Sequence, residues 1–225
     1  MVEVSTSILN VKKENIIATI YNLEVAKTDY FHIDVMDGKF VEQDTTEMMQ
    51  EYCNNIKQIS NLPLDVHLMV ENVKVYIELF IPYNPNIITF HLEVCKDKDE
   101  VYSLIKYLKE NDIKVGISIK PKTEVEEILE FLPLVHLVLI MTVEPGYGGQ
   151  KLIPETLDKV KQIKEYIDKN DIDIDIEVDG GINLENEEIL KENGANVIVA
   201  GSSIINSKDF KEVIGKLKCE IDNKE

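Results

Sequence analysis

Residues 31–38 read "FHIDVMDG" and combine the pattern of a buried β-strand with side chains that such a strand usually avoids. His32, Asp34 and Met36 are spaced two apart, so in a strand their side chains lie on one face. An unpaired charge inside a protein core is costly. The stretch therefore predicts a strand that delivers an imidazole, a carboxylate and a thioether to a functional site.

Seven further stretches have the same apolar, Val- and Ile-rich character. They cover residues 2–9, 64–69, 87–93, 114–120, 136–143, 174–180 and 197–203. Nearly continuous hydrophobicity is typical of parallel strands that are buried on both faces. Helix-type patterns separate these strands, for example over residues 11–27, 96–112 and 154–170, with a final helix predicted over about residues 207–222. Pro154 suits the first turn of the third of these helices.

The chain has 225 residues and shows neither a linker nor a low-complexity tract. Eight strand–helix units over this length predict a single (β/α)8 TIM barrel, an α/β fold, spanning residues 1–225. An open, doubly wound parallel sheet is the alternative arrangement. Eight regular repeats, and polar chemistry spread from the first strand to the last, favour the closed barrel.

Charge and cysteine content narrow the classes of partner and location. The net charge of −18 argues against nucleic acid and anionic membranes as main partners. All 24 basic residues are lysines, so a bound phosphate would be held by lysines, hydroxyls or backbone N–H groups. Cys53, Cys95 and Cys219 are widely spaced, which suits a reducing cytosol. With no signal-peptide pattern and no long apolar run, we expect a soluble, cytoplasmic protein.

Four side chains of the kind that bind metals fall near the ends of predicted strands. His32 and Asp34 lie on the second strand, His67 on the third and Asp179 at the end of the seventh. In a barrel the C-terminal ends of the strands meet at one rim, where active sites lie. One such histidine is more often a hydrogen-bonded core residue, and an Asp before two glycines is more often a turn former. Together they predict a site for zinc, manganese, iron or cobalt.

Other polar and sulfur-containing residues fall near the same predicted rim. Ser7, Met69 and Met141 lie near the ends of the first, third and sixth strands. His91 also ends a strand, and we interpret it as a structural residue or as one that supports a metal ligand. His136 begins its strand, at the opposite rim, and is assigned no role.

Three glycine-rich or small-residue turns follow the late strands. They are "PGYGGQ" (145–150), "DGG" (179–181) and "GSS" (201–203). Loops after the seventh and eighth strands commonly bind phosphate in barrels of this kind. Glycine lets the backbone approach an anion closely, and exposed N–H groups supply the hydrogen bonds. The three turns together predict an anion site that needs no arginine.

Six motifs spread along the chain carry a resemblance to a known family: "SIL" (7–9), "HIDVMDG" (32–38), "LDVHLMVENV" (64–73), "IMTVEPGYGGQ" (140–150), "IEVDGG" (176–181) and "VAGSS" (199–203). On these motifs nearly the whole chain resembles the ribulose-phosphate 3-epimerase family. The resemblance implies a barrel of the ribulose-phosphate-binding type. It also implies a metal-dependent isomerase of the pentose phosphate pathway that interconverts D-ribulose 5-phosphate and D-xylulose 5-phosphate by proton transfer at C3 through an enediolate. Members of the family are commonly homo-oligomers.

Positions that match the family's motifs carry its functional roles. The resemblance implies one divalent metal ion bound by His32, Asp34, His67 and Asp179, with Asp34 and Asp179 as the two acid/base groups. The implied substrate contacts are Ser7, Met36, His67, Met69, Met141, Gly146, Tyr147, Gly148, Gly149, Gly180, Gly181, Gly201 and Ser202.

Two loops depart from the family pattern. After the second strand the chain reads "DGKFVEQDTT" (37–46), where Glu42 and Gln43 replace a usual Pro-Asn pair, and the first loop reads "SILNVKK" (7–13) instead of "SILSADF". The altered loops leave room for a related epimerase of hexulose phosphates such as D-allulose 6-phosphate. Two further interpretations are a phosphosugar-binding paralogue without activity and a phosphate-binding barrel without metal.

Overall fold

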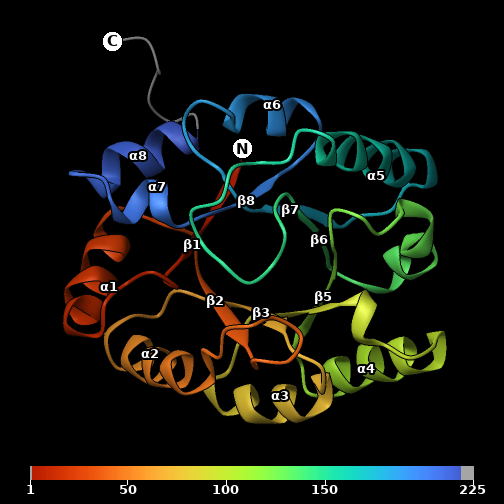
Figure 1. The fold of residues 1–225 in the computed structure, drawn as a ribbon, viewed down its shortest axis with the longest axis horizontal. Helices are drawn as coiled ribbons and strands as arrows, with labels where there is room; N and C mark the ends of the chain where they lie inside the picture. The colour runs from red at the N-terminus through yellow and green to blue at the C-terminus, as the bar shows by residue number, and fades with distance from the viewer. Residues whose placement is uncertain (1, 219–225) are drawn as a thin grey trace.

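The computed structural model describes residues 2–218. Within these residues, eight parallel strands alternate with helices and close into a barrel, around which the helices form an outer ring (Figure 1). The strands are β1 Glu3–Ser7, β2 Tyr30–Met36, β3 Leu64–Met69, β4 Ile87–His91, β5 Lys114–Ile119, β6 Leu137–Met141, β7 Asp175–Asp179 and β8 Val197–Ala200. Each strand pairs with its sequence neighbours, and β8 pairs with β1. This closed arrangement confirms the predicted (β/α)8 barrel, and the alternative of an open sheet is wrong.

The connections between strands hold α-helices and short 3-10 helices. The α-helices are α1 Ile16–Val25, α2 Thr46–Ile59, α3 Val73–Phe80, α4 Lys98–Glu110, α5 Thr156–Asn170, α6 Glu187–Glu192, α7 Ser202–Ile205 and α8 Phe210–Leu217. The 3-10 helices are η1 Lys13–Asn15, η2 Ile81–Tyr83, η3 Leu92–Val94, η4 Val125–Glu127 and η5 Leu129–Leu134.

The predicted helices differ from the observed ones mainly at their ends. The helix predicted to open on Pro154 begins two residues later, and Pro154 lies in the turn before it. The helix predicted over about residues 207–222 begins at Phe210, and its predicted end lies outside the described residues. Between β5 and β6 only 3-10 helices form. Pro133 lies inside η5, and its missing N–H disfavours a regular α-helix there.

Helix α4 illustrates how the sequence builds the outer ring. Asp97 caps it by accepting a hydrogen bond from the Glu100 N–H at 2.9 Å. Val101, Leu104 and Leu108 recur at helical spacing and are buried against the barrel. The hydrophobic layer between strands and helices therefore holds the barrel closed, while polar faces of the helices meet solvent.

The interior of the barrel is divided into an apolar part and a polar part. A small apolar cluster comprises Ile87, Leu137, Leu139, Met141 and Val143, which come mainly from β4 and β6. Buried polar side chains come mostly from β1, β2, β3 and β7, namely Ser5, His32, Asp34, Asp65, His67 and Glu177, and further ones, Thr89, His91 and Ser118, come from β4 and β5. Carboxylates and imidazoles are rarely placed in a barrel interior for stability, so this half of the barrel is the place to seek a site.

Strand register brings the first site residues together. In the pairing of β2 with β3, Asp34 stands opposite His67 and Met36 stands opposite Met69. In the pairing of β6 with β7, Met141 stands opposite Asp179. Within residues 2–218, no helix combines the length and apolar character needed to cross a membrane.

Candidate active site

The side chains of His32, Asp34, His67 and Asp179, here called the donor cluster, converge at the C-terminal mouth of the barrel. One potential ligand atom from each lies within 4.8 Å of the others. His32 Nε2 is 3.5 Å from Asp34 Oδ1 and 4.0 Å from Asp179 Oδ2. His67 Nδ1 is 3.9 Å from Asp34 Oδ1 and 3.6 Å from Asp179 Oδ2. Residues from three strands thus point their donor atoms at one small space.

The two imidazole nitrogens that face this space have no hydrogen-bond partner. Both His32 and His67 are fully buried, and His32 Nε2 and His67 Nδ1 are unpaired. A buried polar atom without a partner costs free energy unless something else binds it. Two ligands about 2.0–2.2 Å from a shared ion lie at most about 4.0–4.4 Å apart, so the observed separations fit one divalent ion.

Asp34 is held in the ionised form. Burial alone raises the pKa of Asp34, but the neighbouring His32, His67 and the hydroxyl of Ser7 outweigh burial and lower it. Ser7 Oγ donates to Asp34 Oδ2 at 2.7 Å, which leaves Oδ1 facing the donor cluster. Ser7, which the resemblance assigns to substrate contact, therefore also orients this carboxylate.

Asp65 and Glu177 extend the polar network below the donor cluster, and the sequence analysis did not assign them a role. His32 Nδ1 lies 2.6 Å from Asp65 Oδ2, and Ser5 Oγ donates to the same oxygen at 2.7 Å. Burial and the adjacent Asp65 raise the pKa of Glu177 well above its ordinary value, which favours its neutral form. The sequence does contain a signal for these two residues, which is their spacing. Asp65 lies two residues before His67, and Glu177 lies two residues before Asp179, so each shares a strand face with a member of the donor cluster.

His91 lies behind His67, on the side away from the cluster. The Nε2 atoms of His67 and His91 are 2.9 Å apart, and His91 Nδ1 lies 3.1 Å from Glu93 Oε2. The interpretation of His91 as a residue that supports a ligand therefore matches its position. Glu93, in η3, was missed, although the strand predicted over residues 87–93 includes it and it lies two residues after His91. His136 lies apart from this network, where its Nδ1 accepts a hydrogen bond from the Val115 N–H.

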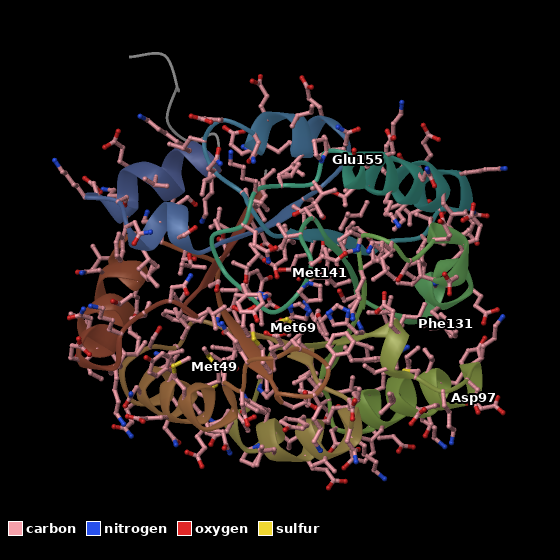
Figure 2. All side chains as sticks on the ribbon, viewed as in Figure 1. Met49, Met69, Asp97, Phe131, Met141 and Glu155 are labelled. Carbon is pink, nitrogen blue, oxygen red and sulfur yellow. The ribbon has the colours of Figure 1, made fainter. Side chains whose placement is uncertain are left out.

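A cleft above the donor cluster encloses about 560 Å3, part of it open to solvent. Its lining includes these predicted site residues: Ser7, Asp34, Met36, Met69, Met141, Gly146, Tyr147, Gly148, Gly149, Asp179, Gly180, Gly181, Gly201 and Ser202. His32 and His67 lie beneath it, fully buried. Residues that the sequence analysis did not assign, such as Asn10 and Gln150, complete the wall. Figure 2 shows Met69 and Met141 near the centre of the ring, whereas Met49, a residue of α2, lies further out.

The turns over residues 145–150, 179–181 and 201–203, here called the glycine rim, surround the mouth of the cleft. Gly180 and Gly181 have positive φ angles of 123° and 72°, which favour glycine. A Cβ on Gly181 would lie 2.3 Å from the Leu152 backbone N. Glycine at position 181 therefore allows two backbone segments to meet at the edge of the cleft, where N–H groups can face an anion.

The segment between β6 and α5 arches across the barrel mouth, in teal in Figure 1. Tyr147 donates its hydroxyl to Glu42 Oε2 at 2.5 Å, linking this segment to the loop after β2. The Gln150 amide donates to the backbone oxygens of Glu144 and Tyr147, which braces the segment internally. Glu42 is one of the residues at which the chain departs from the family pattern, so this contact depends on the altered loop.

The molecule is a closed (β/α)8 barrel with a candidate divalent-metal centre beside glycine-rich turns suited to an anion. Residues 3–205 match the model of the ribulose-phosphate 3 epimerase family. The chain belongs to the ribulose-phosphate 3-epimerase family.

Curated relatives agree with this family assignment. The chain is 43% identical over 194 residues to the ribulose-phosphate 3-epimerase of Helicobacter pylori strain J99, covering 86% of this chain and 87% of the relative. It is 37% identical over 219 residues to the Bacillus subtilis strain 168 enzyme of the same name, covering 97% and 99%.

Solved structures of other barrels share the fold. KGPDC from Streptococcus mutans superposes with a TM-score of 0.70 at 8% identity, covering 98% of this chain and 97% of that one. A 3-hexulose-6-phosphate synthase superposes with a TM-score of 0.69 at 12% identity, covering 98% of this chain and 100% of the other. At these identities the likeness concerns the fold alone.

Proposed function

We propose that this protein interconverts D-ribulose 5-phosphate and D-xylulose 5-phosphate by proton transfer at C3. Its membership of the epimerase family and the curated relatives named ribulose-phosphate 3-epimerase support this reaction. The observation that carries the proposal is the convergence of four donor side chains, two of them acids, at the floor of one cleft. We assign the whole chain, residues 1–225, to one domain.

Epimerisation next to a ketone needs a proton removed from one face of the substrate and another delivered to the opposite face. Two carboxyl groups can do this when one is ionised and the other protonated. Asp34 comes from β2 and Asp179 from β7, and β1 and β8 separate these strands in the barrel. We assign Asp34 as the base in one direction, because its lowered pKa keeps it ionised and therefore able to accept a proton. Asp179 then delivers the proton, and the roles exchange in the reverse direction.

The donor set fits one divalent metal ion bound by His32, Asp34, His67 and Asp179. The unpaired His32 Nε2 and His67 Nδ1 and the separations of 3.5–4.0 Å support this assignment. Zinc, manganese, iron and cobalt all accept such a mixed imidazole and carboxylate set. When bound, such an ion polarises the ketone and stabilises negative charge on the enediolate, which lets a carboxylate act as a sufficient base.

The remaining assigned residues position the substrate and exclude water. Met36, Met69 and Met141 are at most 2% exposed and line the cleft with polarisable sulfur atoms. Backbone N–H groups of the glycine rim hold the phosphate, and Gly181 and Gly201 let the rim pack closely against Leu152 and Ser7 at the edge of the cleft. The absence of arginine from the chain supports a phosphate site built from backbone donors.

The related hexulose-phosphate reaction is the second candidate, because Glu42 and Gln43 alter a loop at the mouth of the cleft. The decisive measurement is turnover of D-ribulose 5-phosphate and of D-allulose 6-phosphate by protein reconstituted with one metal at a time. We expect the pentulose phosphate to have the higher kcat/KM. Higher kcat/KM for the hexulose phosphate contradicts the substrate assignment, and no exchange of solvent deuterium into either sugar contradicts the reaction.

Location and assembly are further proposals. The widely spaced cysteines support a reducing, cytoplasmic location, and the family resemblance supports a homo-oligomer. Light scattering coupled to size-exclusion chromatography tests the assembly, because a mass of 25.7 kDa identifies a monomer.

A further inference from the structure

His67 is connected to Glu93 through His91 by two consecutive hydrogen bonds, here called the His67 relay. His67 Nε2 and His91 Nε2 are 2.9 Å apart, and His91 Nδ1 is 3.1 Å from Glu93 Oε2. Both imidazoles are fully buried, whereas the Glu93 side chain is 20% exposed at the rim. The relay therefore runs from the donor cluster to the edge of the barrel.

The chemistry of the three groups sets the direction of every hydrogen bond in the relay. An ionised carboxylate only accepts, so His91 Nδ1–H donates to Glu93. Full burial favours the neutral form of His91, which has a single N–H. His91 Nε2 is then an acceptor, and His67 Nε2–H donates to it. His67 consequently carries its lone pair on Nδ1, the atom that faces Asp34 and Asp179.

Glu93 is itself held in place. Its Oε1 accepts a hydrogen bond from the Lys120 N–H at 2.6 Å and another from the Thr123 hydroxyl. Phe40 packs against His91 with ring centroids 4.8 Å apart, and Lys120 Nζ lies 3.7 Å from the Phe40 centroid. These contacts keep Oε2 aimed at His91 and keep the His91 ring from turning.

We propose that Glu93 is a positioning residue that acts through His91 to fix the tautomer and ring orientation of His67. This inference rests on the proposed function, because it concerns how a proposed metal ligand presents its free nitrogen. Outer partners of this kind hold metal-binding histidines in other proteins. His32 has a simpler support, since its Nδ1 lies 2.6 Å from Asp65 Oδ2.

The substitution Glu93→Gln tests the direction of the relay. The Lys120 N–H is fixed backbone and needs an acceptor, so the Gln carbonyl oxygen takes the place of Oε1. The amide NH2 then faces His91 Nδ1 and donates, which reverses both hydrogen bonds. We expect the proton of His67 to move to Nδ1, toward the donor cluster, where it competes with a metal ion.

The first readout is the tautomer itself. The chain has four histidines, so ring nitrogens labelled with 15N give a simple spectrum in chelated protein at mildly alkaline pH. We expect wild-type His67 to be protonated at Nε2 and the Glu93→Gln variant to be protonated at Nδ1. Wild-type protein protonated at Nδ1, or a variant with an unchanged tautomer, overturns the proposal. This readout does not depend on catalysis, so it stands even if the proposed epimerase activity fails.

The second readout is the affinity for Co2+, followed by its visible absorption. We expect Glu93→Gln to weaken binding by about 10- to 100-fold. The matched control is Glu100→Gln, because Glu100 also accepts a backbone N–H, from Lys96 at 2.9 Å, but contacts no histidine. Equal affinities for wild type and both variants overturn the proposal. If Glu93→Gln does not fold, Glu93→Ala replaces it and is expected to leave His67 as a mixture of tautomers.

Discussion

The donor cluster and the glycine rim face the same cleft but are built in different ways. The cluster consists of side chains on β2, β3 and β7, and three of its four residues are at most 4% exposed. The rim consists of loop backbone, and Tyr147 within it is 47% exposed. Strand register therefore places the groups assigned to chemistry, while glycine conformation shapes the groups assigned to binding.

A shift in strand register would disturb the site more than a shift in the backbone of the glycine rim. A strand slipped by one residue would turn Asp34 and His67 away from the barrel interior, because successive side chains point to opposite faces. A rim loop can shift without such an all-or-none change. We therefore expect substitutions in the cluster to act mainly on kcat and substitutions in the rim to act mainly on KM.

The largest expected effect is loss of turnover on Asp34→Asn or Asp179→Asn. Removal of an acid/base group costs about 10²- to 10⁴-fold in rate, and each aspartate is also assigned as a metal ligand. Asp175→Asn is the matched control, because Asp175 begins β7 at the other end of the strand. Activity measured beside circular dichroism separates chemistry from folding. Near-normal kcat in either site variant would show that the two-carboxylate scheme is wrong.

Removal of the metal ion should lower kcat nearly as strongly as these substitutions, and its effect should be confined to the donor cluster. We expect chelation to lower kcat by about a hundredfold or more, since polarisation by a metal ion can supply several kcal/mol. Readdition of a divalent ion should restore activity. Far-ultraviolet circular dichroism should change little, because the apolar layer between strands and helices closes the barrel. Full activity in protein shown to be free of metal by elemental analysis contradicts the metal assignment.

In the rim, Gly181→Ala should raise KM by about tenfold and lower kcat little. An added Cβ meets the backbone of residues 150–152, and φ is 72°, so the turn that faces the phosphate must move. Gly194→Ala is the matched control, since Gly194 also has positive φ, 110°, but its Cβ would meet the Lys164 side chain and no backbone of the rim. We expect it to lower stability and leave KM unchanged. Equal KM values for Gly181→Ala and Gly194→Ala would contradict the assignment of the glycine rim to substrate binding.

A smaller effect is expected at the contact between Tyr147 and Glu42. Both side chains are exposed, and exposed hydrogen bonds contribute little. Tyr147→Phe and Glu42→Ala should each raise KM a few-fold, and the double variant should resemble the single ones because all three lack the same bond. Additive effects would mean that the two residues act separately on the substrate.

A separate effect, on stability and not on turnover, is a pH-dependent difference at Glu93. Partial burial opposes ionisation, but hydrogen bonds from His91, Lys120 and Thr123 lower the pKa of Glu93 from 4.5 to about 2. The stabilising effect of the charged form is therefore present above pH 4.5 and is lost as the pH falls toward 2. The difference in free energy of unfolding between chelated wild type and Glu93→Gln should narrow over that range in urea titrations. A constant difference contradicts the lowered pKa.

Much of this barrel could be predicted from local sequence. The eight Val- and Ile-rich stretches predicted the strands, with small errors at their ends, and alternation on "HIDVM" (32–36) predicted which side chains face inward. The irregular connection between β5 and β6 was not predicted, although Pro133 was a signal for it. The assigned roles of the site residues remain predictions until they are measured.

The amino-acid sequence was sufficient to indicate the barrel, the family and the residues that meet at its mouth, because continuous hydrophobic runs, the spacing of polar residues within them and short motifs are local properties. How those residues are supported became visible only in three dimensions. The contacts of Asp65 with His32, of Glu93 with His91 and of Glu42 with Tyr147 join residues whose side chains meet only after the barrel closes. Hydrogen-bond partners depend on distance and direction in space, and sequence spacing specifies neither.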